Sequence, residues 1–336
     1  MNGGKIRHGG KEKYNMKCIK VYDLSSNSLS LKNGFYGGIA SNKDGILIND
    51  EEWIVKYPRS LSQMEGENAS YSSSSLSEYL GSEIYRILGY DVHQTILGVR
   101  NNKLIVACKD FAVDGFLLEI RTIKNHLSGD LLDSSGSYSS IHSSSTHVVD
   151  IDELMFHLEK NPVLNVIEGI KQHFFEQALV DIFINNNDRN NGNWGILRVK
   201  GQNDRVAPVF DNGACFSPKM GEDKIMRLLS SGELKNNCLN VLTAYGRNGH
   251  LFSAKKFIQE FQNCLEFKNA LSSVTDRIAA HLDEITDFIN SLPEFVAVND
   301  KVYEVCSRNR KILYQRQLTL RFNELILPAR NGSPKL

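Results

Sequence analysis

The sequence predicts an α+β fold with two lobes, a small β-rich N-terminal lobe at 18–110 and a larger, mainly helical C-terminal lobe at 111–327. Two observations favour this fold. Up to about Phe111, short apolar runs typical of strands alternate with glycine and asparagine. Beyond residue 150, apolar residues recur at helical spacing. A chain of 336 residues with 41% hydrophobic content can bury cores of this size.

The N-terminal lobe is expected to be a small sheet with a single helix. Its predicted strands are the runs 46–48, 53–57, 95–99 and 103–111. One helix is predicted from about Leu76 to Leu88, with Gly89 after its end. The serines at 72–75 that precede it are candidate N-caps.

The C-terminal lobe is expected to contain helices and a single hairpin. A serine-rich segment of low complexity predicts a mobile loop at 128–147. The strongest helical patterns cover 165–185, 254–268, 271–291 and 308–327. The hairpin joins 194–199 to 206–211 through a GQND turn.

The termini and the bulk composition exclude several function classes. Residues 1–17 are glycine-rich and basic without an apolar core, which predicts a disordered leader rather than a secretory signal, and 328–336 form a short tail. No run reaches the length of a membrane-spanning helix. Basic and acidic residues each total 39, so there is no overall field to concentrate nucleic acid or anionic membrane. The six scattered cysteines form no C-x-x-C pair, which favours a reducing, cytoplasmic compartment.

The most informative stretch lies between residues 173 and 213, where an apolar helical stripe leads into a polar loop. Asp188 precedes Asn193 by five residues, and a second acid, Asp211, follows the hairpin. Transfer of a phosphoryl group from ATP needs an acid beside the attacking hydroxyl and oxygen ligands for Mg²⁺. Most Asn- and Asp-rich loops are only turns. However, protein kinases have the same order of Asp, Asn, hairpin and metal-binding Asp.

Several runs of the chain resemble the HipA-like serine/threonine kinases, and within them the CtkA-type proinflammatory bacterial kinases. The similarity is carried by NNNDRNNGNWGILR at 185–198 and APVFDNGAC at 207–215. It extends to WIVKYP at 53–58, SEYLGSEIYRILGYDVHQTILG at 77–98 and IVACKDF at 105–111. The resemblance therefore covers most of the chain between about 33 and 213.

This resemblance implies a two-lobed, protein-kinase-like fold with ATP and Mg²⁺ bound between the lobes. Asp188 would orient the acceptor hydroxyl and take its proton, and Asn193 and Asp211 would hold the metal. The implied acceptors are protein serine and threonine hydroxyls, the chain's own among them. An antitoxin or a host protein is the implied partner of an otherwise monomeric chain, which would be cytoplasmic or secreted without a signal peptide. Relatives often have histidine where this chain has Asn190, so one titratable group is missing from the loop.

The segment NGFYGGIASNKDG at 33–45 predicts a nucleotide-phosphate cradle. Glycine lets backbone N–H groups approach phosphate oxygens closely, and Gly34, Gly37, Gly38 and Ser41 are the expected contacts. A glycine-bearing hairpin turn would look the same in isolation. Lys56, eleven residues after Gly45, lies in a predicted strand where kinases place the lysine that pairs with the α- and β-phosphates.

Two further elements complete the expected nucleotide site. A helix glutamate should hold Lys56, and the sequence offers two candidates. Periodicity favours Glu83, whereas the match to relatives favours Glu78, which we take as the expected partner. The run at 106–111 is similar to the linker between kinase lobes, so the adenine is expected beside a short segment at its centre. Its four residues are Ala107, Cys108, Lys109 and Asp110. Cys108 itself is expected to be a buried, inert thiol.

Two alternative functions fit the same motifs. A phosphoinositide-type lipid kinase shares the D-R-x-x-x-N loop, and a phosphoinositide assay would separate it from a protein kinase. A nucleotide-binding pseudokinase that acts as an interaction module would bind ATP without turnover. The presence of Asp188, Asn193, Asp211 and Lys56 argues against this second alternative.

Overall fold

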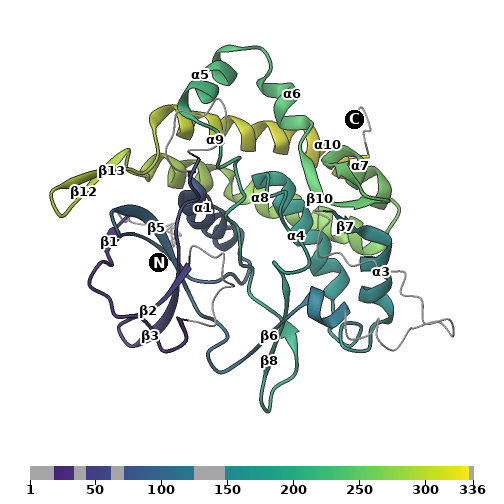
Figure 1. Ribbon diagram of the computed structural model, residues 1–336. Coiled ribbons are helices and arrows are strands. Elements are labelled where there is room, and N and C mark those ends of the chain that lie inside the picture. Colours follow the sequence, from purple (N-terminus) through teal and green to yellow (C-terminus); the bar gives the residue numbers. More distant parts are fainter. Residues whose placement is uncertain (1–18, 34–42, 62–71, 125–147, 333–336) are drawn as a thin grey trace, which may run out of the picture.

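The N-terminal lobe is built on a five-stranded sheet. A computed structural model describes residues 19–33, 43–61, 72–124 and 148–332 (Figure 1). The strand order is β1-β4-β5-β3-β2, with β1 parallel to β4 and the other pairs antiparallel. The strands are β1 (Val21–Asp23), β2 (Lys43–Ile48), β3 (Glu51–Lys56), β4 (Thr95–Arg100) and β5 (Lys103–Lys109).

Two tight turns fix the register of this sheet. Asn49 and Asp50 join β2 to β3, and Asn101 and Asn102 join β4 to β5. All four residues have positive φ angles between 50° and 62°, which two-residue hairpins of this hand require and which Asn and Asp tolerate. The resulting register places Lys43 opposite Lys56 at the open end of the sheet.

Helix α1 (Ser74–Ile87) packs against β4 and β5 and also faces the C-terminal lobe. One of the preceding serines, Ser73, occupies the N-cap as expected, but its side chain does not cap the helix. Its hydroxyl instead donates to the Pro218 carbonyl oxygen at 3.1 Å and makes no capping bond. The first turn of α1 is thereby joined to the other lobe.

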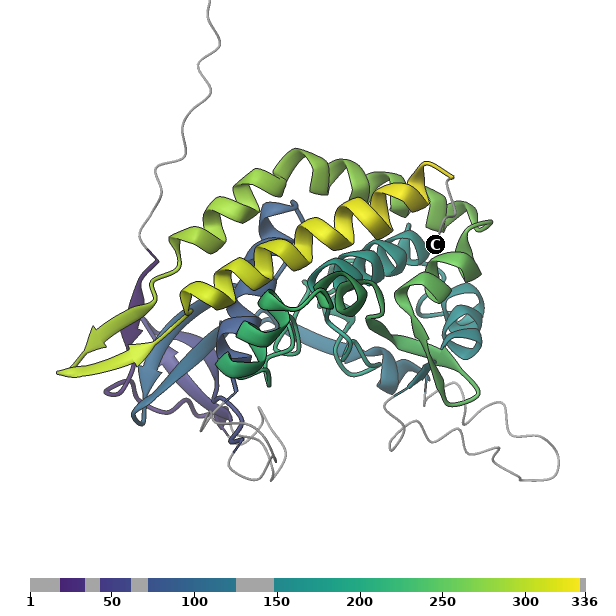
Figure 2. The ribbon, with the colours of Figure 1, turned by 90° about the horizontal axis from the view of Figure 1, so that it is seen from above.

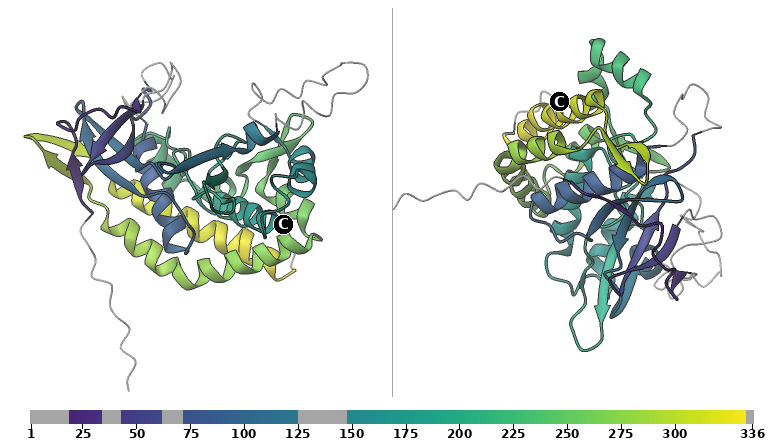
Figure 3. Two further views of the ribbon diagram at one scale, coloured as in Figure 1. Left: turned by 90° about the horizontal axis from the view of Figure 1, so that it is seen from below. Right: turned by 90° about the vertical axis from the view of Figure 1, so that its left-hand side faces the viewer.

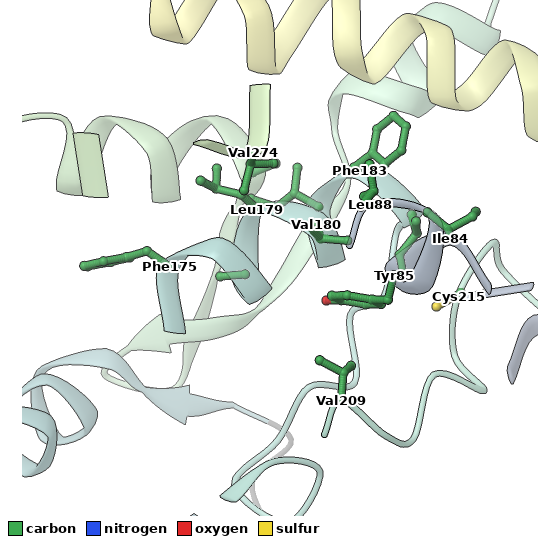
Figure 4. Close-up of a cluster of buried hydrophobic side chains, with 14 of the residues drawn as sticks. Ile84, Tyr85, Leu88, Phe175, Leu179, Val180, Phe183, Val209, Cys215 and Val274 are labelled. Carbon is green, nitrogen blue, oxygen red and sulfur yellow. The ribbon is translucent and has the colours of Figure 1, made fainter. Parts of the chain in front are cut away.

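The C-terminal lobe is organised around the buried helix α4 (Ile170–Ile184). It begins after Gly169, whose left-handed φ of 71° starts the helix five residues later than predicted, and it ends at Asn185. Apolar side chains from α1, α4 and α8 (Leu265–Ser291) meet in one core (Figure 4). Tyr85 and Ile84 of α1 lie there beside Val180 and Phe183 of α4. Helix α4, which leads into the loop carrying Asp188, is therefore held in place by this core.

The remaining helices surround this core. They are α3 (Ile151–Lys160), α5 (Glu222–Ser230), α6 (Leu234–Leu239), α7 (Ala254–Phe261), α9 (Arg308–Arg321), a π-helical turn (Phe322–Ile326) and α10 (Leu327–Arg330). Helices α8 and α9 run side by side along one face of the molecule (Figure 2). No helix in the described ranges is both long and apolar enough to cross a membrane.

Two helix boundaries differ from the prediction. The break expected between 268 and 271 lies at 262–264, because turning there lets Phe261 and Phe267 both pack on Phe175. The final helical segment continues to Arg330 through the π-helical turn, so part of the expected tail is helical.

The expectation of a single C-terminal hairpin is also wrong. The predicted hairpin corresponds to β8 (Gly195–Val199) and β9 (Arg205–Val206), with β6 (Gly115–Glu119) added alongside β8. Two more hairpins follow. One pairs β10 (Leu242–Arg247) with β11 (His250–Ser253), and β7 (Val149–Asp150) joins β10 on its other edge. The other pairs β12 (Phe295–Val298) with β13 (Lys301–Glu304).

The β12–β13 hairpin reaches from the C-terminal lobe to the N-terminal sheet (Figures 1 and 3). Asn299 at its tip donates to Asp23 at 2.5 Å, and Lys301 donates to Asn102 at 2.8 Å. A second connection lies at the base of the cleft, where His93 and Val209 share a backbone hydrogen bond of 3.0 Å. The two lobes are thus joined on both sides of the cleft.

Candidate active site

A cavity of about 450 Å³ lies between the lobes and is lined by residues from both. Apolar side chains such as Ile54, Leu117 and Phe210 form part of its lining, together with a set of polar and charged residues. The polar and charged residues include Lys43, Lys56, His93, Cys108, Lys109, Asp110, Glu119, Arg121, Asn193 and Asp211. The expected phosphate cradle, with Gly34, Gly37, Gly38 and Ser41, lies outside the described residues.

Lys56 connects the two lobes at the inner wall of this cavity. Its Nζ lies 2.9 Å from Glu78 Oε2 on α1 and 2.9 Å from Asp211 Oδ1 after the β8–β9 hairpin. Glu83, the other candidate partner, pairs with Arg86 at the surface instead. Lys56, Glu78 and Asp211, separated by up to 155 positions in the sequence, therefore form one ion-paired group.

This group is held in its charged form. Burial opposes the charge on Lys56, but the carboxylates of Asp211 and Glu78 raise its pKa well above the ordinary value. Burial likewise opposes ionisation of Glu78, yet Lys56 and then His93 lower the pKa of its carboxyl group. The pKa of Asp211 is also lowered, against burial, chiefly by Lys56. An anionic Asp211 is the form that can bind a cation.

A polar network behind Glu78 fixes its orientation. Glu78 Oε1 accepts from the backbone N–H of Asn212 at 3.0 Å and lies 3.2 Å from His93 Nε2. Ser82 Oγ lies 3.0 Å from both His93 Nε2 and Asn212 Nδ2. Burial lowers the pKa of His93, so the imidazole is neutral at pH 7.

Sequence reasoning missed His93 and Ser82, although α1 carries a signal for them. One face of the helix is formed by small residues around Glu78, and Gly81 belongs to it. A Cβ at Gly81 would lie 2.9 Å from Asn212 Cβ and from Cys215 Sγ, so glycine lets the segment that carries Asp211 approach the helix. A buried face of small and polar residues beside an apolar stripe indicates a second packing surface.

The loop that follows α4 exposes Asp188 to solvent, and Gly192 and Asn193 of the same loop line the cavity whereas Asp188 does not. The Asn193 side-chain amide donates to the Asp188 carbonyl oxygen at 2.6 Å, which closes the loop across five residues. This bond uses the amide nitrogen of Asn193 and leaves its Oδ1 as the group that can bind a cation. Asn190 Nδ2 lies 3.4 Å from the Asp188 carboxylate.

Arg189 is completely buried beneath the loop and joins three elements. Its guanidinium makes a two-pronged ion pair with Asp181 of α4, at 2.8 and 3.0 Å. The same group donates to the Asn193 carbonyl oxygen at 2.9 Å and to Asn212 Oδ1 at 2.6 Å. It also donates to the Phe210 carbonyl oxygen. The residues beside Asp188 and Asp211 are therefore positioned by a single side chain.

No protein-family model matches the chain. Serine/threonine-protein kinase CtkA of Helicobacter pylori strain J99 is 29% identical over 215 residues. That match covers 63% of this chain and 61% of the length of CtkA.

Solved structures extend the similarity to nearly the whole chain. The crystal structure of a Helicobacter pylori proinflammatory kinase CtkA aligns with a TM-score of 0.75 and 23% identity, covering 94% of this chain and 100% of that one. The chain shares the fold of this CtkA structure. HipA of Shewanella oneidensis MR-1, solved with HipB and operator DNA, aligns with a TM-score of 0.51 at 14% identity over 88% of this chain and 67% of its own. The predicted resemblance and the predicted fold class are both confirmed.

Within this HipA-like kinase fold, the oxygen atoms near the cavity suit a hard divalent cation. Asp211 uses Oδ1 for Lys56, and its side chain remains 37% exposed, with Oδ2 available. Its backbone adopts a left-handed φ of 58°, which turns the chain sharply at this carboxylate. Together with Asn193 Oδ1, this is the carboxylate and amide donor set that Mg²⁺ prefers.

The outer end of the cavity is formed by β5 of the HipA-like kinase fold and the residues after it. Ala107 and Cys108 lie between β3 and β4, so their backbone groups belong to the sheet. Lys109 N–H donates to the Gln94 carbonyl oxygen at 2.8 Å, and Asp110 N–H donates to the Glu52 carbonyl oxygen at 2.9 Å. Cys108 lines the cavity with its thiol, whose pKa burial raises.

Proposed function

We propose that this chain is an ATP- and Mg²⁺-dependent serine/threonine protein kinase. The observation that carries the proposal is the ion-paired group of Lys56, Glu78 and Asp211, of which Lys56 and Asp211 line one cavity with Asn193. These residues come from both lobes and meet beside a loop with an exposed acid, Asp188. The HipA-like kinase fold and the similarity to CtkA support the same activity.

Each residue has a defined part in the proposed transfer. Lys56 pairs with the α- and β-phosphates, and Glu78 keeps it in place. Asn193 and Asp211 hold Mg²⁺, which when bound neutralises charge on the phosphates. Asp188 orients the acceptor hydroxyl and takes its proton as the new bond from oxygen to the γ-phosphorus forms and the bond to the β-phosphate oxygen breaks. The products are ADP and a phosphorylated side chain.

The adenine is proposed to lie at the outer end of the cavity, beside Cys108, Lys109 and Asp110. Because the backbone of Ala107 and Cys108 belongs to the sheet, the adenine edge would meet the chain after β5, near Phe111 and Ala112. We also propose that the glycines at 34, 37 and 38 and Ser41 approach the phosphates from the N-terminal lobe.

Protein hydroxyls are the proposed acceptors, and a protein is the proposed partner. The HipA structure contains HipB together with operator DNA. The formal net charge of this chain is zero, so binding to nucleic acid would depend on such a partner. We also propose that the chain is monomeric and lies in a reducing, cytoplasmic compartment, where the free thiols of the described cysteines would stay reduced.

A phosphate-transfer assay tests the proposal. The purified chain is incubated with γ-labelled ATP, Mg²⁺ and a general protein acceptor such as casein, and in parallel with phosphoinositide vesicles. Label on protein serine or threonine, removed by EDTA, is the expected result. Label on the lipid alone would make the chain a lipid kinase, and Mg-ATP binding without any turnover would make it a pseudokinase. Either result would overturn the proposal.

A further inference from the structure

The loop that follows α4 and carries Asp188 and Asn193 brings no accessible positive charge of its own to the cavity. Arg189 is its sole basic residue, and that side chain is buried against Asp181. In the proposed reaction the leaving and transferred phosphate oxygens carry several negative charges, which a kinase must stabilise as the γ-phosphoryl group moves. A positively charged side chain from outside this loop is therefore needed, in addition to the metal, to stabilise the charge on the γ-phosphate.

Four lysine and arginine side chains line the cavity, and three of them have a close ionic partner. Lys56 is shared between Glu78 and Asp211 at the inner wall. Lys109 donates to Glu51 at 2.6 Å, at the outer end where the adenine is proposed. Lys43 stands opposite Lys56 on β2, in the N-terminal lobe. Arg121 is the basic lining residue of the C-terminal lobe.

Arg121 is fixed directly against the loop that carries Asp188. Its backbone N–H donates to the Asn191 carbonyl oxygen at 2.8 Å. Its guanidinium lies over Gly192, where a Cβ would come within 1.9 Å of Arg121 Nη2. The Asn190 amide oxygen lies 3.2 Å from the same Cβ position, so Arg121 and the loop residue next to Asp188 share one side of Gly192.

Arg121 forms a weak, exposed ion pair with Glu119 that a phosphate group could replace. Nη2 lies 3.0 Å from Glu119 Oε2, and the side chains are 51% and 34% exposed. Ion pairs this exposed contribute little stability. A phosphate group offers the guanidinium a stronger, two-pronged hydrogen-bonding partner. Glu119 also lines the cavity, so it can hold Arg121 in place when no phosphate is present.

We propose that Arg121 binds the γ-phosphate of ATP and stabilises it during transfer, with Glu119 as its resting partner. This inference rests on the proposed kinase function and adds a phosphate-binding residue from outside the loop that carries Asp188. A side chain at position 192 would displace the guanidinium, which is the mobile end of the Arg121 side chain. It also predicts that this chain distinguishes ATP from ADP through Arg121.

The test compares R121Q and R121K with a matched control, R198Q. Arg198 is on β8 of the same small sheet, is 50% exposed and pairs with Asp204, but does not line the cavity. Calorimetry measures the affinities for Mg-ATP and Mg-ADP, and single-turnover assays measure transfer to the acceptor. We expect R121Q to lose about 10²-fold in transfer rate. It should lose at least about tenfold in ATP affinity while ADP affinity stays unchanged, with R121K intermediate and R198Q like wild type.

Three outcomes would overturn this assignment. R121Q that keeps both its transfer rate and its ATP affinity would remove Arg121 from the phosphate site. Equal losses for ATP and ADP would mean a general effect on the pocket, not contact with the γ-phosphate. Loss of protein phosphorylation with unchanged ATP affinity and ATP hydrolysis would assign Arg121 to the protein acceptor. A wild-type chain that binds ATP without transfer contradicts the proposed kinase function, whereas the ATP and ADP affinities still test Arg121.

Discussion

At the scale of single residues, the site depends on which glutamate holds Lys56. Helical periodicity favoured Glu83 and the match to relatives favoured Glu78; both lie on α1, and periodicity alone cannot show which face meets the other lobe. The structure buries Glu78 against Asn212 and His93 and leaves Glu83 beside Arg86. Which of the two glutamates pairs with Lys56 depends on tertiary packing, and the spacing of residues along the sequence does not reveal that packing.

Glu78→Gln should therefore weaken both stability and activity. Loss of the charge removes strong hydrogen bonds from Lys56 and from the Asn212 N–H, each worth about 1.5–3 kcal/mol when one partner is charged. Misplacement of Lys56 should lower the rate of phosphate transfer by about 10²-fold. Urea denaturation and initial-rate assays measure the two effects. Glu83→Gln is the control and should stay within about 0.5 kcal/mol of wild type; equal effects of the two substitutions would contradict the assignment.

A second residue-scale prediction concerns pH. Burial lowers the pKa of His93 below its unfolded value of about 6.5, although Glu78 opposes this shift. Below about pH 6.5 the unfolded state therefore binds a proton that the folded state excludes, and stability falls as pH falls. His93→Gln should reduce this dependence by up to about 1.4 kcal/mol per pH unit. Denaturation midpoints between pH 7.5 and 5 measure it, and parallel curves for the two proteins would reject it.

At the scale of elements, Arg189 joins α4, the loop that carries Asp188 and the segment that carries Asp211. The sequence placed this arginine beside Asp188 but gave no sign of its role, because Asp181, Asn212 and the carbonyl groups that it contacts are assembled only by folding. Its burial means that it cannot serve as a ligand for substrate. It is a positioning residue.

Arg189→Ala should destabilise the chain strongly, because it leaves the Asp181 carboxylate buried without its ionic partner. Breaking a buried ion pair on one side costs about 3–5 kcal/mol. The exposed pair of Arg198 with Asp204 offers a control in which the same substitution should cost less than about 1 kcal/mol. Chemical denaturation compares the two variants. Similar losses of stability would show that Arg189 is not a structural clamp.

The elements missed by sequence analysis had local signals. The two additional hairpins turn at Asn248-Gly249 and at Asn299-Asp300, and all four residues have positive φ angles. Asn-Gly between apolar runs is a strong hairpin signal, but the surrounding helical patterns concealed these short strands. Helix α4 is buried on nearly all sides, so no single apolar face marks its start. The strands β2 to β5 and helix α1 were predicted well because their apolar patterns are regular. Helix boundaries that depend on aromatic packing, such as the one at 262–264, were not.

At the scale of the whole molecule, the cavity exists because distant segments meet. The motif residues could be identified from sequence through their spacing and resemblance, yet contacts such as His93 with Glu78 required the folded chain. The β12–β13 hairpin, which connects the C-terminal lobe to β1, had no sequence pattern pointing to the other lobe. Local periodicity determines elements, whereas contacts across lobes depend on topology.

Ligand binding at this cavity should stabilise the whole chain. A ligand that binds only the folded state at 100 times its dissociation constant adds about 2.7 kcal/mol. Mg-ATP should accordingly raise the melting temperature, and EDTA should remove most of the increase. Asp211→Asn should show a much smaller increase than wild type, because it loses a charged metal ligand. A rise that is the same with and without Mg²⁺ would contradict the proposed metal site.

The most direct test of the central claim is Asp188→Asn, which changes one carboxylate to an amide of nearly the same shape. If Asp188 takes the proton of the acceptor hydroxyl, the rate of phosphate transfer should fall by about 10²–10⁴-fold. Because Asp188 is exposed and both proposed metal ligands remain, Mg-ATP affinity and melting temperature should stay close to wild type. Asparagine suits the same turns as aspartate, so a purely structural Asp188 would leave a variant with most of its transfer rate. That result would contradict the mechanism proposed for this chain.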